Sequence, residues 1–167
     1  MKTLILVRHA KSSWDNPNLS DHDRPLLEIG KKRTRLVISR LQNLKVQPDI
    51  IISSSAVRAL ETAKYIAKGL NYPVESIKTS NAYYMASEQE LINEFFDMPD
   101  RFNTVILTGH NPTLTNLANK FLSKPLDNLP TSGVVKICFK SNRWDQIMHA
   151  ELESQDIITP KNSKSNK

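Results

Sequence analysis

The stretch TLILVRHA, residues 3–10, decides the fold of this chain of 167 residues. Its apolar run is too short for a helix and shows no alternation, which is typical of a strand buried on both faces of a sheet. Two further runs, at residues 50–52 and 105–107, have the same character. The pair Arg8-His9 follows the first run directly. We therefore expect a sheet whose strands end at polar, chemically active side chains.

Helical patterns separate these strands. Apolar residues recur at helical spacing over 29–44 and 56–70, and Ser87 with Glu90 forms a capping-box pattern ahead of a third helix. Asn111 and Pro112 are typical of a cap and a first-turn proline before a fourth helix. This alternation predicts an α/β fold, a three-layer αβα sandwich with a mostly parallel central sheet.

The last part of the chain divides into two final strands and a tail. Residues 133–140 and about 144–152 have the pattern of two strands, close enough in sequence for a hairpin. The tail is rich in lysine, asparagine and serine and poor in apolar residues, which is typical of a flexible segment. We expect a single domain over residues 1–154 and a flexible basic tail over residues 155–167.

Composition excludes several classes of protein. The net charge of +6 is spread along the chain, without zinc-finger spacing or aromatic stacking motifs, so we expect no nucleic-acid partner. The single cysteine, Cys138, excludes an intramolecular disulfide and favours a reducing compartment. No run approaches the ~20 apolar residues of a membrane span. We expect a cytoplasmic protein with no membrane association.

Two histidines and two arginines follow the ends of the three buried strands. Arg8 and His9 follow the first strand, Arg58 the second, and His110 the third. Each of these residues, taken alone, has an ordinary explanation as a surface or core side chain. Because ligand sites in parallel sheets lie beyond the carboxyl ends of the strands, their shared position predicts one site.

The residue types in this group point to phosphate. Two guanidinium groups match the oxygens of a phosphate, and two imidazoles offer a nucleophile and a donor. Arg58 lies in the first turn of its helix, where the helix dipole disfavours a cation unless an anion is bound nearby. No cysteine or carboxylate stands at metal-ligand spacing from the histidines, so we expect no metal and no other cofactor.

These motifs resemble the histidine phosphatase superfamily. Arg8-His9-Ala10 is similar to its Arg-His-Gly signature, and Gly109-His110 to its second histidine motif. The segment from Ser54 through Arg58 to Thr62 is similar to its second arginine motif. The chain length and the short motifs resemble the branch of the phosphohistidine phosphatase SixA; those motifs are Asp23-Arg24-Pro25-Leu26, Tyr84 and Gly109-His110-Asn111-Pro112.

The resemblance implies a phosphoglycerate mutase-like fold without metal or organic cofactor. It also implies that His9 is the catalytic nucleophile that becomes phosphorylated, while Arg8, Arg58 and His110 hold the phosphoryl oxygens. The implied partner is a phosphorylated substrate, either a phosphoprotein or a small phosphate compound. Oligomeric state and pathway do not follow from the motifs.

Two departures from the family pattern bear on the chemistry. Ala10 stands where the family has glycine, so the backbone there must suit alanine. The general acid is undefined: Glu88 is the nearest candidate, although an acid in the first turn of a helix also simply complements the dipole. A missing acid favours phosphohistidine as substrate, because its leaving imidazole is easily protonated. Whether Arg24 reaches the pocket stays open.

Two alternatives remain beside a phosphohistidine phosphatase. One is a phosphomonoesterase of the same superfamily that acts on a small phosphate ester. The other is a non-catalytic phosphate-binding module.

Overall fold

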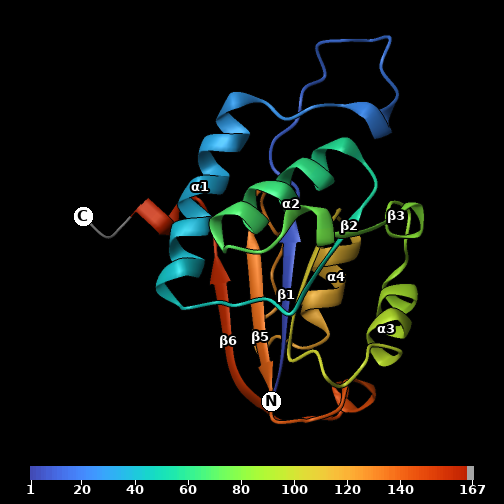
Figure 1. Cartoon of the computed structure of the whole chain (residues 1–167), viewed down its shortest axis with the longest axis vertical. Coiled ribbons are helices and arrows are strands. Elements are labelled where there is room, and N and C mark those ends of the chain that lie inside the picture. Colours follow the sequence, from blue (N-terminus) through green and yellow to red (C-terminus); the bar gives the residue numbers. More distant parts are fainter. Residues whose placement is uncertain (165–167) are drawn as a thin grey trace.

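A six-stranded sheet forms the centre of the computed structural model, which describes residues 1–164 (Figure 1). The strand order is β3-β2-β4-β1-β5-β6, in which β5 is antiparallel to both of its neighbours, β1 and β6, and all the other neighbouring pairs are parallel. The strands are β1 (Lys2–Arg8), β2 (Ile50–Ser54), β3 (Lys78–Ser80), β4 (Thr104–Gly109), β5 (Val134–Phe139) and β6 (Leu152–Ile158).

Helices cover both faces of this sheet, which confirms the predicted α/β sandwich (Figure 1). One face packs against α1 (Glu28–Asn43) and α2 (Val57–Gly69), and the other against α3 (Glu88–Phe96) and α4 (Thr113–Asn119). Short 3-10 helices complete the chain: η1 (Asp21–Asp23), η2 (Val74–Ser76), η3 (Asn81–Tyr83), η4 (Trp144–Gln146) and η5 (Asn162–Lys164). No helix among residues 1–164 is long and apolar enough to cross a membrane.

The central strand β1 is continuously apolar because the sheet is covered on both faces at this position. Ile5 and Val7 pack in the cluster under α1 and α2, whereas Leu4 and Leu6 pack in the cluster under α3 and α4. All four side chains are buried. Because successive side chains of a strand point to opposite faces, a strand covered on both faces must be apolar at every position.

The helix starts agree with the predicted capping patterns. Ser87 Oγ accepts a hydrogen bond from the backbone N–H of Glu90 at 3.2 Å, and Glu90 Oε2 accepts one from the N–H of Ser87 at 2.7 Å. At the start of α4, Asn111 Oδ1 accepts from the N–H of Thr115 at 3.2 Å. The helix itself begins after Pro112, one residue later than the first-turn proline predicted.

The last strand differs from the prediction. Residues 144–146 form η4, and β6 extends over residues 152–158, so the first four residues of the predicted tail belong to the sheet. Trp144 gives this segment a strand-like pattern, but it is the first residue of η4, where it is fully buried and its Nε1 donates to the carbonyl of Phe102 at 2.7 Å. As an edge strand, β6 carries many polar side chains, and these made it resemble a tail.

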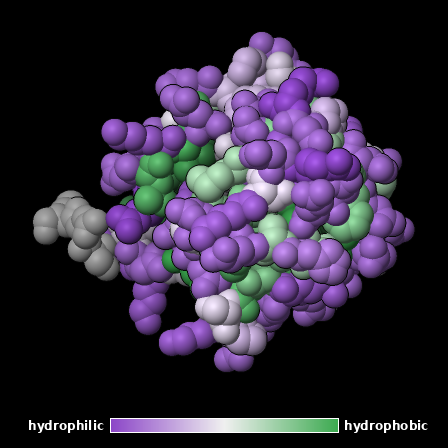
Figure 2. Space-filling model, turned by 90° about the horizontal axis from the view of Figure 1, so that it is seen from below, coloured by the Kyte–Doolittle hydropathy of each residue, from purple (hydrophilic) through white to green (hydrophobic). Residues whose placement is uncertain are grey.

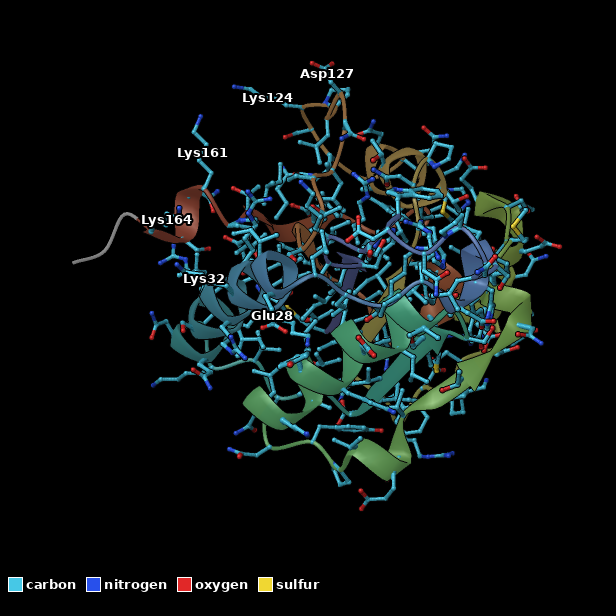
Figure 3. All side chains as sticks on the ribbon, turned by 90° about the horizontal axis from the view of Figure 1, so that it is seen from above. Glu28, Lys32, Lys124, Asp127, Lys161 and Lys164 are labelled. Atoms are coloured by element: carbon cyan, nitrogen blue, oxygen red, sulfur yellow. The ribbon has the colours of Figure 1, made fainter. Side chains whose placement is uncertain are left out.

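The segment after β6 packs against the domain as far as it is described. The helix η5 contacts α1, and Figure 3 shows Lys161 and Lys164 on the same side of the molecule as Lys32 of α1. Residues 165–167 of the predicted tail lie outside the described residues. The prediction of a flexible tail is therefore wrong for residues 155–158, which pair with β5.

Candidate active site

The sheet brings the four predicted side chains to one edge. Arg8 ends β1 beside Gly109 of β4, so His9 and His110 leave neighbouring strands at the same level. Their ring centroids lie 5.2 Å apart. Arg58, the second residue of α2, directs its Nε toward Nε2 of His9 at 3.4 Å. The four residues therefore lie close together, as expected from the sequence.

Both ring nitrogens of His9 have a partner, and Nε2 accepts a hydrogen bond from Arg58 Nε. Its side chain is buried, and its Nδ1 lies 2.8 Å from the carbonyl oxygen of Ala10. A carbonyl only accepts, so Nδ1 carries the proton, and Nε2 is left with the lone pair that faces Arg58. Burial, followed by the charges of Arg58 and Arg8, lowers the pKa of His9 to about 4, against the opposing effect of the Ala10 bond. The imidazole is neutral at physiological pH.

Ala10 fits where the family pattern has glycine. Residues with a positive φ among those described are Lys45, Asn71 and Ser132, so the backbone at position 10 requires no glycine. Ala10 is fully buried, and its N–H donates to Thr62 Oγ1 at 2.9 Å. This bond ties the loop after β1 to α2, next to Arg58.

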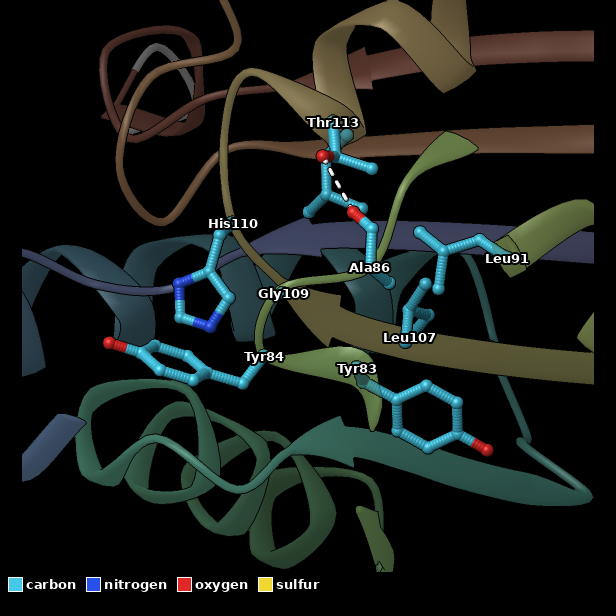
Figure 4. A pocket seen from close by; sticks show the side chains of 9 residues that line it. Tyr83, Tyr84, Ala86, Leu91, Leu107, Gly109, His110 and Thr113 are labelled. Atoms are coloured by element: carbon cyan, nitrogen blue, oxygen red, sulfur yellow. Dashed lines mark hydrogen bonds between the residues drawn. The ribbon is translucent and has the colours of Figure 1, made fainter. Parts of the chain in front are cut away.

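His110 is also neutral and has one nitrogen to spare. Its Nε2 lies 2.8 Å from Ser54 Oγ, while its buried Nδ1 has no hydrogen-bond partner among the described residues. Burial, with smaller contributions from His9 and Arg58, lowers the pKa of His110 to about 3. The edge of its ring meets Tyr84 with a centroid separation of 5.5 Å (Figure 4).

Arg8 keeps part of its donor capacity unused. Its Nη1 donates to the carbonyl of Leu129 at 2.9 Å, whereas its buried Nε has no partner among residues 1–164. Burial lowers the pKa of Arg8 from its usual value, although a guanidinium remains charged at any physiological pH. An orphaned donor of this kind is satisfied by an anion that binds beside it.

Asp21 is the residue that the sequence argument missed. Its carboxylate accepts from Arg58 Nη2 at 2.9 Å, from Arg24 Nε at 3.1 Å and from the hydroxyl of Tyr84 at 2.5 Å. The Tyr84 bond, followed by the bond and charge of Arg58, lowers the pKa of Asp21 to about 2, against the opposing effect of partial burial. Asp21 is therefore a permanent carboxylate and no proton donor at neutral pH. The (i, i+3) spacing of Asp21 and Arg24 is the signal that was available.

The sequence left open whether Arg24 and Glu88 belong to the site, and the structure places only Arg24 there. Arg24 is buried, bonds Asp21, and contributes to lowering the pKa of both His9 and His110. Glu88 instead accepts from Asn116 Nδ2 at 2.8 Å and is not hydrogen-bonded to His9, His110 or the arginines. It begins α3, as expected of an acid that complements a helix dipole.

The electrostatics of the cluster favour an anion. The charges of Arg8, Arg24 and Arg58 all act on His9, whereas the carboxylate of Asp21 pairs with Arg24 and Arg58, so positive charge is in excess. Both histidines are neutral and contribute donors or lone pairs rather than charge. Within residues 1–164, no three His, Cys, Asp or Glu side chains are grouped as they would be to hold a metal ion.

Known proteins match both the sequence and the fold. The family model of the histidine phosphatase superfamily (branch 1) matches residues 4–79. An uncharacterized chloroplastic protein of Arabidopsis thaliana is 30% identical over 159 residues, which cover 87% of this chain and 70% of that protein. An uncharacterized protein of Mycobacterium leprae is 27% identical, covering 91% of this chain and 96% of the relative.

The chain belongs to the histidine phosphatase superfamily. Its fold is similar to that of the protein histidine phosphatase SixA complexed with tungstate, with a TM-score of 0.80, 20% identity and coverage of 96% and 98% of the two chains. It is also similar to a mycobacterial glucosyl-3-phosphoglycerate phosphatase, with a TM-score of 0.65, 15% identity and coverage of 91% and 97%. The phosphoglycerate mutase-like fold expected from the motifs is confirmed, and superfamily membership supports a phosphatase.

Proposed function

We propose that this protein is a phosphatase that transfers a phosphoryl group from phosphohistidine in a protein to His9 and then to water. The observation that carries this proposal is the orientation of His9: its protonated Nδ1 is bonded to Ala10, and its Nε2 lone pair faces the Arg58 guanidinium. A neutral imidazole with its lone pair directed at an anion site is what nucleophilic attack on phosphorus requires.

The reaction follows from this arrangement in two steps. His9 Nε2 attacks phosphorus in line and forms a phosphohistidine, while the leaving nitrogen or oxygen keeps the electron pair of the bond that breaks. Water then attacks the same phosphorus and loses a proton to the solvent. The P–N bond breaks, its electron pair returns to His9 Nε2, and inorganic phosphate is released. Charge gathers on the equatorial oxygens in both steps, and preorganised donors on Arg8, Arg58 and His110 are placed to stabilise it.

The protonation states favour phosphohistidine over an ester as substrate. Asp21 is ionised and Glu88 is bonded to Asn116, so neither carboxyl supplies a proton to a leaving group at neutral pH. An alkoxide leaving group benefits from such a donor by about 10²–10⁴-fold. The imidazole that leaves from phosphohistidine takes up a proton readily and depends less on it.

The similarity to SixA agrees with this choice. That protein is named a protein histidine phosphatase, and its structure holds tungstate, a tetrahedral oxyanion. The alternative within the superfamily is a phosphomonoesterase for a small ester, in line with the similarity to glucosyl-3-phosphoglycerate phosphatase. Comparing kcat/KM for phosphohistidine and p-nitrophenyl phosphate separates the two substrate classes.

The covalent intermediate gives the decisive test. Protein mixed with ³²P-labelled phosphohistidine and quenched in alkali should carry a label that is stable to alkali and labile to acid. The His9→Ala variant should carry none and should have no measurable turnover. A label that persists in His9→Ala assigns the nucleophile elsewhere, and a wild-type protein without turnover on either substrate class leaves only a phosphate-binding module.

A further inference from the structure

The two most exposed large apolar side chains of the described residues belong to loops beside the candidate active site. Met85 is 82% exposed and Trp14 is 75% exposed, more than any other large hydrophobic side chain of residues 1–164. The end of the molecule opposite the site is mostly hydrophilic and also carries several apolar patches (Figure 2). Exposed apolar side chains gathered at one place on a surface are typical of a binding site.

Trp14 is held in place although it is exposed. The guanidinium carbon of Arg24 lies 3.4 Å from the centre of a Trp14 ring, which is stacking distance. Arg24 itself is fixed by bonds to Ser12 Oγ at 3.0 Å and to Asp21 Oδ1 at 3.1 Å. The indole therefore loses little conformational freedom when a partner covers its remaining surface.

The chain is anchored on both sides of Met85, at Tyr84 and at Ala86. The residue before it, Tyr84, donates its hydroxyl to Asp21 Oδ2. The residue after it, Ala86, accepts a bond from Thr113 Oγ1 at 3.0 Å (Figure 4). Arg24 and Tyr84 thus bond the two oxygens of the Asp21 carboxylate. Trp14 stacks on Arg24, and Met85 follows Tyr84 in the chain.

The cavity that adjoins the site on the His110 side is too small to enclose a substrate. The cavity beside His110, closed by Tyr84, Leu91 and Leu114, measures about 10 Å³, room for no more than a water molecule (Figure 4). The lining of this cavity does not include His9, Arg8 or Arg58, so the cavity does not hold the group that carries the phosphoryl. The surface on the other side of Asp21 and Tyr84, where Trp14 and Met85 lie, is available for contacts with that group.

We propose that Trp14 and Met85 form a docking rim for the apolar surface of a folded protein that presents its phosphohistidine to His9. This inference rests on the proposed function and names the feature that selects a protein over free phosphohistidine. The arginine cluster attracts the phosphoryl group, and the rim adds apolar contact area around it. Exposed tryptophan anchors of this kind dominate the energetics of many protein interfaces.

Two substrates with the same scissile bond test the rim. One is free phosphohistidine, and the other is a small tryptophan-free protein phosphorylated on a surface histidine with phosphoramidate. Truncating an anchor typically costs an interface about tenfold or more. Trp14→Ala and Met85→Ala should each lower kcat/KM for the phosphoprotein by about that factor, with kcat/KM for free phosphohistidine unchanged. Ile157→Ala, an exposed apolar residue on edge strand β6, is the matched control.

An equal loss on both substrates, or no loss on the phosphoprotein, overturns the rim while leaving the phosphatase intact. A second experiment measures binding without turnover, using the His9→Ala variant, which lacks the nucleophile and so binds the phosphoprotein without dephosphorylating it. Trp144 is fully buried, so iodide quenches mainly Trp14. The phosphoprotein should protect this fluorescence from iodide, and unchanged quenching at saturation overturns the rim even if the proposed reaction fails.

Discussion

The Nε atom of Arg58 lies 3.4 Å from Nε2 of His9, and both groups are fixed from behind. The two remaining nitrogens of Arg58 bond the carbonyl and the carboxylate of Asp21 at 2.6 and 2.9 Å. On the other side, His9 Nδ1 bonds the carbonyl of Ala10. An incoming phosphoryl group therefore meets a lone pair and a donor whose positions are already set, which is the preorganisation that catalysis needs.

Arg58→Lys should abolish most of the activity although it keeps the positive charge. A lysine has no planar fork, so it cannot bond Asp21 twice and also direct a donor at His9. We expect kcat to fall by about two to three decades, the cost of losing one preorganised donor. Arg143→Lys is the control, because the Arg143 side chain is exposed and, within residues 1–164, bonds Asp145 alone. Equal activity of Arg58→Lys and wild type would mean that charge alone suffices.

The pKa of His9 can be measured directly by NMR titration of its ring protons. Because burial and the neighbouring arginines lower this pKa to about 4, the signal should not shift between pH 8 and 5.5. Arg58→Gln removes one positive charge and should move the midpoint upward. Assignment follows from the signal missing in His9→Asn, and a wild-type midpoint near 6.5 would contradict the lowered pKa of His9.

The same shift makes stability depend on pH. In the unfolded chain His9 binds its proton at the ordinary pKa of about 6.5, whereas in the folded protein it does so only near pH 4. The unfolded state thus binds more protons between these values, and the free energy of unfolding should fall as the pH drops from 6.5 to 4. His9→Asn should flatten this part of the curve in urea unfolding, and an unchanged slope would assign the effect to other groups.

The sequence predicts the site well where the chain geometry is regular. The continuous apolar run of β1 indicates a strand buried on both faces, and parallel strands end at a common edge, so Arg8, His9 and His110 must meet. Arg58 follows the same logic from the next strand. These inferences need only the period of the strands and their direction.

The parts that the sequence did not predict depend on contacts across long separations. Asp21 lies in a polar loop without periodicity, and its partners Arg58 and Tyr84 are 37 and 63 residues away. The edge strand β6 has little apolar surface to bury, so its pattern resembles that of a solvent-exposed tail. In both cases the decisive information is which segments become neighbours, and local patterns do not contain it.

Asp21→Asn should separate binding of an oxyanion from turnover. The substitution keeps the size of the side chain but removes the negative charge that occupies Arg58 and Arg24. Tungstate should therefore inhibit the variant at a lower concentration than it inhibits wild type. At the same time kcat should fall, because Arg58 is no longer held by a carboxylate. Tighter inhibition with an unchanged kcat would make Asp21 only a competitor for the anion site.

Gly30→Ala should destabilise the protein, although alanine is the better helix former. A Cβ atom at position 30 would lie 2.4 Å from the carbonyl oxygen and 2.9 Å from the nitrogen of Lys11, two residues after His9. Such a clash with backbone typically costs about 1–3 kcal/mol, against about 1 kcal/mol gained in helix propensity.

Gly109→Ala is the matched control for this clash. Its Cβ would meet nothing closer than Leu114 at 3.6 Å, and neither glycine has a positive φ. Gly109 ends a strand whereas Gly30 lies in a helix, so Gly109→Ala lacks both the clash and the gain in helix propensity. Urea unfolding should show a lower midpoint for Gly30→Ala than for Gly109→Ala. If Gly30→Ala is as stable as wild type, the backbone at Lys11 moves aside without loss of stability, and the expected clash with α1 does not occur.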